Sequence, residues 1–144
     1  LEKNALLPGR IFRDDREKLV IGADTVVCLD GKILGKPKDE EQAFDMLKNL
    51  SGRIHEVYTG VTVFSGNFRC LTFHEMTQVS FYDICDEDIR DYISTKEPMD
   101  KAGAYGIQGM GCFLVKGIRG DYFNVMGLPA AHLLRVLKGQ EDEI

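Results

Sequence analysis

The segment KLVIGADTVVCL places an acidic residue, Asp24, in the middle of an apolar run. Such a run is typical of a strand, and a carboxylate buried there without a partner costs free energy. Buried carboxylates are usually paired, bound to a metal ion or used in catalysis. Gly22 and Ala23 would let a ligand approach the backbone, and Thr25 adds a hydroxyl group. A structural role, as a strand-end aspartate bonded to a neighbouring turn, is an equal alternative from this motif alone.

Two basic residues stand close to predicted element ends. Lys36, in GKPK, comes directly before a predicted helix start, where the helix N-terminus favours anions. Arg53, in SGRIHEVYTG, follows a helix and can bind a phosphate through two parallel hydrogen bonds. The alternatives are a solvated surface lysine and a surface ion pair for Arg53. We interpret the neighbouring His55 as structural, because nothing beside it makes it a base or a metal ligand.

The stretch EPMDKAGAYGIQG combines charged residues with closely spaced glycines, which allow a loop to fold tightly around a ligand. It contains Lys101 and Gln108. An amide side chain carries a donor and an acceptor, which matches the N3–H and O4 edge of uracil or thymine. Alternatively, Gln108 satisfies backbone groups of its own loop. The glycine spacing fits neither a dinucleotide-binding fingerprint nor a Walker loop.

The elements that must position these residues follow from periodicity and turn signals. Residues 18–29 and 32–34 are predicted strands, joined by the tight-turn pair Asp30-Gly31. Asp39 and Gln42 resemble a capping box at the start of an amphipathic helix, which ends near Gly52.

The second half of the chain alternates between strand and helix patterns. We predict the following elements: a hairpin of 54–64 and 68–82, a helix from Asp86, an irregular loop over 96–111, a strand over 112–118 and a helix over 127–139. Asn124 is predicted to cap this last helix, with contact to a ligand as the alternative. Strands mixed with helices, without a strict alternation, indicate an α/β domain with a curved, mixed sheet and flanking helices.

Length and charge narrow the function classes. The chain has 144 residues, which suits a single domain over 1–144, and a net charge of −5, which argues against a nucleic-acid binder. Its cysteines are widely spaced, and we expect buried thiols at Cys28, Cys70 and Cys112 in a reducing compartment. No apolar stretch reaches membrane-spanning length and no signal peptide is visible, so we expect a cytoplasmic protein with no membrane partner.

Four motifs in series resemble one known family. IGADTVV, LGKPKDEEQAFDMLKNLSGRIHEVYTGV, EPMDKAGAYGIQG and GDYFNVMGLP have the order and spacing found in the Maf family of septum-formation-inhibitor-like nucleoside triphosphate pyrophosphatases. The resemblance extends from about Lys3 to Leu137. It implies two lobes around a cleft, and hydrolysis of a nucleoside triphosphate to the monophosphate and pyrophosphate with a divalent metal, Mg²⁺ or Mn²⁺.

The resemblance also assigns roles to individual residues. Asp24 matches the family's catalytic and metal-binding carboxylate. A second group matches positions that bind substrate: Thr25, Lys36, Arg53, Lys101 and Gln108. Thr25 after the catalytic aspartate, together with the sequence YGIQG, resembles the dTTP/UTP branch of the family. Whether the chain forms a homodimer is left open by the sequence.

One family feature is missing from the resemblance. Family members begin with a strand and a Ser-Xaa-Ser-Pro-Arg-Arg loop, whereas this chain begins with LEKNALLPGR, which has helical spacing. We therefore expect an N-terminally truncated pyrophosphatase domain. The alternative is a non-catalytic nucleotide-binding or scaffold remnant of the same family.

Overall fold

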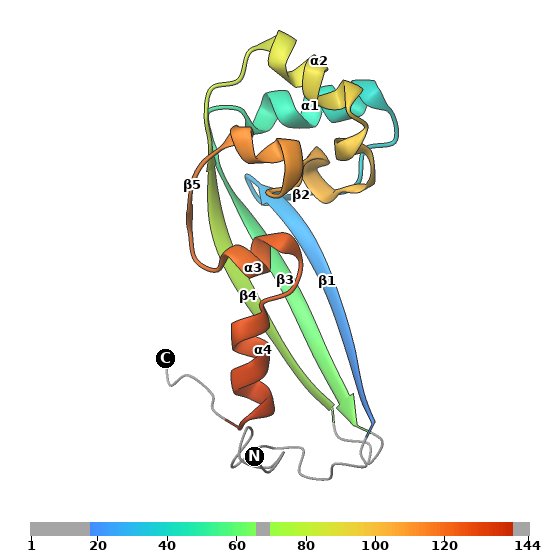
Figure 1. The fold of residues 1–144 in the computed structure, drawn as a ribbon, viewed down its shortest axis with the longest axis vertical. Helices are drawn as coiled ribbons and strands as arrows, with labels where there is room; N and C mark the ends of the chain where they lie inside the picture. Colours follow the sequence, from blue (N-terminus) through green and yellow to red (C-terminus); the bar gives the residue numbers. More distant parts are fainter. Residues whose placement is uncertain (1–17, 66–69, 140–144) are drawn as a thin grey trace.

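The computed structural model describes residues 18–65 and 70–139, so the predicted helical spacing of LEKNALLPGR and the hairpin turn lie outside the described residues. A five-stranded sheet has the strand order β2-β1-β3-β4-β5. Its long central strands curve along the length of the molecule (Figure 1). The strands are β1 (Leu19–Leu29), β2 (Lys32–Leu34), β3 (Ile54–Ser65), β4 (Cys70–Phe81) and β5 (Val115–Arg119).

The predicted α/β class and curved sheet with flanking helices are confirmed, but every pairing among the described strands is antiparallel. The sheet is therefore not mixed within the described residues. The reason lies in the order of the first strands. β2 and β3 run in the same direction, but β1 lies between them and separates them.

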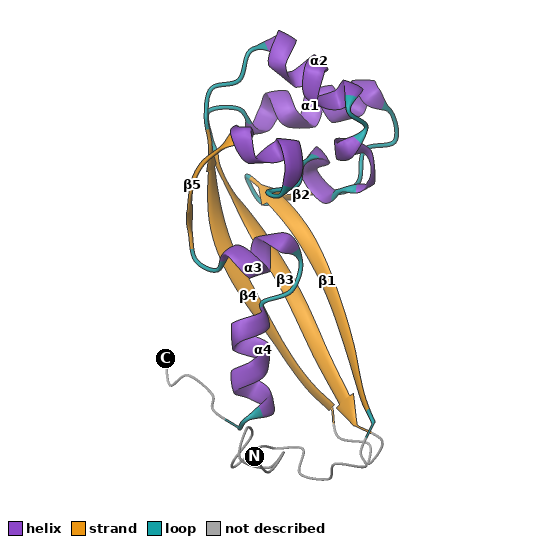
Figure 2. Ribbon diagram, in the orientation of Figure 1, coloured by secondary structure: helices purple, strands orange, loops and turns teal. Residues whose placement is uncertain are grey.

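Helices cover one end of the molecule and part of one face of the sheet (Figure 2). The helices are α1 (Glu40–Leu50), α2 (Asp86–Ser94), α3 (Tyr122–Met126) and α4 (Ala130–Leu137). Three 3-10 turns, η2 (Glu97–Asp100), η3 (Ala102–Ala104) and η4 (Gly109–Leu114), lie beside α1 and α2. No helix within the described ranges combines the length and apolar content required to cross a membrane.

Several local predictions are confirmed. Asp30 and Gly31 have positive φ angles of 52° and 74°, as a tight hairpin turn requires. The Asp39 carboxylate accepts a hydrogen bond from the Gln42 amide at 2.7 Å, so it caps α1 as expected.

Other predictions differ from the structure. The region 96–111 contains 3-10 turns where an irregular loop was predicted, and the last strand begins only at Val115 because 112–114 belong to η4. The prediction that Asn124 caps the last helix is wrong. Asn124 lies within the short helix α3, whose cap is Asp121, and α4 begins after Pro129.

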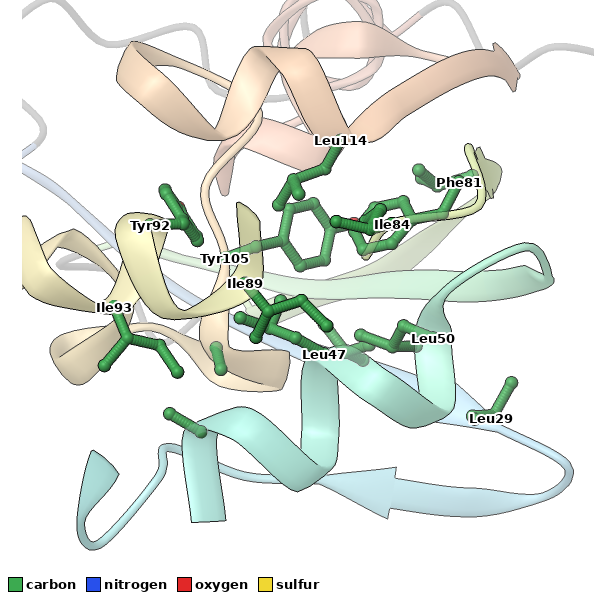
Figure 3. Close-up of a cluster of buried hydrophobic side chains, with 14 of the residues drawn as sticks. Leu29, Leu47, Leu50, Phe81, Ile84, Ile89, Tyr92, Ile93, Tyr105 and Leu114 are labelled. Carbon is green, nitrogen blue, oxygen red and sulfur yellow. The ribbon is translucent and has the colours of Figure 1, made fainter. Parts of the chain in front are cut away.

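The sheet has one covered and one open face. Along β3, residues 55, 57, 59, 61, 63 and 65 are buried, whereas Ile54 and Phe64 on the alternate positions are 60% and 40% exposed. The main core lies between the covered face and the helices at one end (Figure 3). It includes the fully buried side chains Leu47, Leu50, Ile89 and Leu114.

The cysteine prediction is only partly right. All four thiols are free, but Cys70 and Cys112 are exposed and Cys28 is half-buried. Cys70 stands opposite Phe64 on the open face of the sheet, and Cys112 belongs to the surface turn η4. An apolar sequence context therefore did not predict burial, because strand alternation places every second side chain on the open face.

Candidate active site

A cavity of about 330 Å³ lies where β1, the segment after β2, the η2–η4 region and α3 meet. This volume is in the range of small-molecule sites. Five of the six predicted site residues line it: Asp24, Thr25, Lys36, Lys101 and Gln108. These residues come from distant parts of the sequence, so the fold has assembled them at one place.

Thr25 connects β1 to the opposite wall of the cavity. Its Oγ1 lies 2.9 Å from Oγ1 of Thr59 on β3, and it donates to the Gly127 carbonyl at 3.4 Å. Gly127 ends α3. The hydroxyl group therefore holds the end of this helix close to β1.

Asp24 is exposed, contrary to the burial expected from its place in an apolar run. Its strand partner is Gly60, which has no side chain, so β3 leaves open space beside Asp24. β2 pairs only with residues 27–29 of β1, so Asp24 also lies beyond the part of that edge covered by β2. An exposed carboxylate needs no compensating partner.

Successive strand residues point to opposite faces of a sheet. Thr25 contacts Thr59 on the covered face, so the Asp24 side chain is directed toward the open face. The cavity therefore reaches the edge of β1, where both residues contribute to its wall.

The two lysines line the cavity from different segments. Lys101 Nζ donates to Asp100 Oδ1 at 2.9 Å and to the Glu97 carbonyl at 3.0 Å, which fixes its direction. Hydrogen bonding and attraction to Lys101, with a smaller contribution from Lys36, lower the pKa of the exposed Asp100 carboxyl. Lys101 and Lys36 therefore both act on the exposed Asp100 carboxylate.

Gln108 lies in extended backbone with φ −86° and ψ 168°, directly before Gly109, whose φ is +66°. Its side chain is exposed at the cavity. Within 18–65 and 70–139 the Gln108 amide makes no hydrogen bond, so the structure does not support the alternative in which this amide satisfies its own loop. The donor and acceptor are available to a ligand.

Arg53 does not join this cavity. Its guanidinium bonds to the Asp30 carboxylate at 2.5 Å in the turn between β1 and β2, and both side chains are half-exposed. The structure therefore separates Arg53 from the other predicted residues, and agrees with the surface ion-pair alternative.

Tyr105 also lines the cavity, although no sequence motif predicted this role. Its hydroxyl lies 2.7 Å from Nε2 of His55, and both side chains are buried. Burial lowers the pKa of His55 to about 4 and raises the pKa of Tyr105. Both groups are therefore neutral at neutral pH, and the pair supports the wall without adding charge.

The wall formed by α3 was also missed. Val125, Met126 and Gly127 line the cavity. The sequence does carry a signal for this helix, because Asp121 at its start and Gly127 at its end are typical capping residues. Its length of five residues is too short to show an amphipathic period.

The cavity lining offers one carboxylate to a divalent cation. Among the described lining residues Asp24 supplies the carboxylate, and no group of three or more potential ligands occurs in that part of the chain. Mg²⁺ is commonly bound through one or two carboxylates together with substrate phosphates and water. A donor set with one carboxylate agrees with that mode.

The sequence was compared with known protein families. A family model described as Maf-like protein matches residues 2–140. The chain belongs to the Maf family. The resemblance in the four motifs is thereby confirmed across nearly the whole sequence.

Several similar proteins carry the name dTTP/UTP pyrophosphatase. A protein named dTTP/UTP pyrophosphatase from Carboxydothermus hydrogenoformans is 57% identical over 124 residues, which cover 85% of this chain and 67% of that protein. Proteins of the same name from Bacillus cytotoxicus and Bacillus velezensis are 55% and 52% identical, over 85% and 90% of this chain and 63% and 68% of theirs. The chain therefore spans about two thirds of the length of these relatives.

Proposed function

We propose that this Maf-family chain forms the main part of a nucleoside triphosphate pyrophosphatase that hydrolyses dTTP and UTP to the monophosphate and pyrophosphate. The observation that carries the proposal is the cavity that brings Asp24, Lys36, Lys101 and Gln108 together. Relatives at 52–57% identity named dTTP/UTP pyrophosphatase support the same substrate class.

In the proposed reaction the lysines bind the triphosphate. Lys36 and Lys101 line the same cavity from neighbouring segments, which the Gly103 amide and the Gly35 carbonyl join by a hydrogen bond of 3.1 Å, so their charges act on the same bound anion. Binding to these two cations orients the α-phosphate for attack by water.

Gln108 reads the base in this proposal. Its amide has no partner among the described residues, so both its donor and its acceptor remain for the imide edge of uracil or thymine. Cytosine presents the reverse pattern, with N3 as acceptor and N4–H as donor, and purines differ in size, so an amide held in one orientation pairs with them less well, which costs binding free energy. Thr25 fixes the wall next to Asp24.

Asp24 is the proposed general base, which accepts a proton from the attacking water. Its exposed carboxylate lies at the edge of β1, so the phosphates must extend from the lysines past this edge. A divalent cation, held by Asp24 and the phosphates, would neutralise negative charge on the triphosphate. In this proposal the cation is Mg²⁺ or Mn²⁺.

A nucleotide panel tests the proposal. The purified chain is incubated with each common nucleoside triphosphate and Mg²⁺ or Mn²⁺, and pyrophosphate and orthophosphate are measured separately. We expect pyrophosphate with UMP or dTMP. Orthophosphate with a nucleoside diphosphate as first product would contradict attack at the α-phosphate. Binding of dTTP and UTP without turnover would favour the alternative of a non-catalytic nucleotide-binding domain.

A further inference from the structure

The Glu97 carboxylate occupies a central place behind the Gln108 turn, although Glu97 does not line the cavity. Its Oε1 accepts hydrogen bonds from the Tyr92 hydroxyl at 2.9 Å and from the Gly111 amide at 3.0 Å. Its Oε2 accepts from the Met110 amide at 3.0 Å. One side chain thus binds two consecutive backbone amides and a side chain of α2.

The segment before Gln108 is bonded to Tyr92, which is itself hydrogen-bonded to Glu97. The Gly106 amide donates to the Tyr92 hydroxyl at 3.2 Å. Gln108 therefore lies between two fixed points, Gly106 before it and Met110 after it. Both points depend on the hydrogen-bonded pair of Tyr92 and Glu97.

The backbone packs directly on these two side chains. A Cβ atom added to Gly109 would lie 2.7 Å from Glu97 Oε2, and one added to Gly111 would lie 2.7 Å from the Tyr92 hydroxyl. Gly109 also has φ +66°, which glycine adopts without strain. The turn is therefore shaped to contact this carboxylate closely.

The Glu97 carboxylate is held in its charged form. Burial opposes this charge, but the amides of Gly111 and Met110, the Tyr92 hydroxyl and the charge of Lys101 together lower the pKa of Glu97. Hydrogen bonds to an ionised acceptor are stronger than those between neutral groups. The turn is thus fixed by charge-assisted bonds.

We infer that Glu97, together with Tyr92, is a positioning residue that aims the Gln108 amide at the base and so sets the preference for pyrimidine nucleotides. This inference rests on the proposed function of the cavity. Glu97 acts through Gln108, because the turn lies between it and the ligand.

The test is a double-mutant cycle on the full chain. Glu97→Gln keeps the size of the side chain, but its NH₂ group cannot accept the hydrogen bond that Oε2 accepts from the Met110 backbone amide. We expect the ratio of kcat/KM for UTP to that for GTP to fall about tenfold, mainly through KM for UTP. Adding Glu97→Gln to Gln108→Ala should lower this ratio no further than Gln108→Ala alone. Glu87→Gln, an exposed carboxylate in the first turn of α2, is the matched control.

Exchange of the backbone amide hydrogens with solvent gives a readout that does not depend on turnover. In Glu97→Gln the Met110 and Gly111 amides should exchange faster, because their acceptor is weakened. If Glu97→Gln does not fold, Tyr92→Phe removes the bond to Gly106 and should change the selectivity in the same direction.

The outcomes separate this inference from the proposed function. An unchanged UTP to GTP ratio, or losses that add fully in the double variant, would overturn the positioning role while the enzyme assignment stands. If the unsubstituted chain neither binds nor hydrolyses UTP and dTTP, the proposed function fails, and the positioning role fails with it.

Discussion

At the scale of single residues, Asp24 is an exposed carboxylate at the edge of β1. We expect Asp24→Asn to abolish turnover, because an amide neither accepts a proton at neutral pH nor supplies charge to a divalent cation. Nucleotide binding without metal should persist, since both lysines remain. Turnover and equilibrium binding of UTP are measured side by side.

The stability of this variant is a separate check on the role of Asp24. Substitutions at exposed sites usually change the free energy of unfolding by about 0.5 kcal/mol or less. A large loss of stability in urea would assign Asp24 to the fold. Activity within a few-fold of the parent would exclude it as the base.

Gln108 is expected to discriminate between bases. Gln108→Ala should lower kcat/KM for dTTP and UTP by about tenfold or more, because a donor and an acceptor against the base edge are lost. The loss for GTP and ATP should be smaller. Equal losses for all four nucleotides would mean that Gln108 supports the loop and does not read the base.

His55 makes a prediction about pH. Its pKa falls from 6.5 to about 4 on folding because the ring is buried, so the unfolded chain binds a proton at a higher pH than the folded one. Above pH 6.5 the ring is neutral in both states and the free energy of unfolding is at its full value. As the pH falls from 6.5 toward 4, protonation of the unfolded chain lowers this free energy by up to about 3 kcal/mol.

Urea unfolding between pH 7.5 and pH 4.5 measures this effect. In His55→Gln the corresponding part of the pH dependence should be missing, and its curve should be flatter than that of the parent between pH 6.5 and pH 5. Parallel curves for the two proteins would show that His55 titrates normally in the folded state.

At the scale of elements, α3 depends on the sheet for its stability. A five-residue helix does not form by itself, and Asn124 anchors it. The buried Asn124 Nδ2 lies 3.2 Å from the Val57 carbonyl, 3.3 Å from the Glu75 carbonyl and 3.0 Å from Thr77 Oγ1. Asn124 is therefore a main anchor of the cavity wall formed by Val125, Met126 and Gly127, in addition to the Thr25 bond to Gly127.

We expect Asn124→Ala to reduce the free energy of unfolding by about 2–4 kcal/mol, because it removes buried hydrogen bonds and leaves a void. KM should rise as the wall loosens. Asn49→Ala, on the exposed side of α1, is the control and should change stability little. A normal stability for Asn124→Ala would show that α3 docks by its apolar contacts.

At the scale of the whole molecule, the net charge of −5 would repel a triphosphate, so the position of each cation matters more than the total. Lys36 lines the cavity, whereas Lys38, two residues later, does not. Lys36→Ala and Lys38→Ala change the net charge equally. They therefore separate local from overall electrostatics.

We expect Lys36→Ala to raise KM for UTP about tenfold or more and Lys38→Ala to leave it within about twofold, because charge at close range dominates over screened charge. Initial rates at 0.15 M salt measure both. Equal effects of the two substitutions would mean that only the overall charge contributes.

The sequence by itself determined the local structure that short-range chemistry controls. The Asp30-Gly31 turn and the Asp39 cap of α1 follow from residues within a few positions of each other. Four ordered motifs also determined the family and directed attention to Asp24, Lys36, Lys101 and Gln108.

Only the tertiary structure decided which of these residues meet. It placed Arg53 with Asp30 outside the cavity, added Tyr105 and α3 to its wall, and left Asp24 exposed. It also arranged the strands as an antiparallel sheet, with β1 between β2 and β3. The physical reason is that burial and ion pairing depend on neighbours that are distant in the chain, and strand order determines those neighbours.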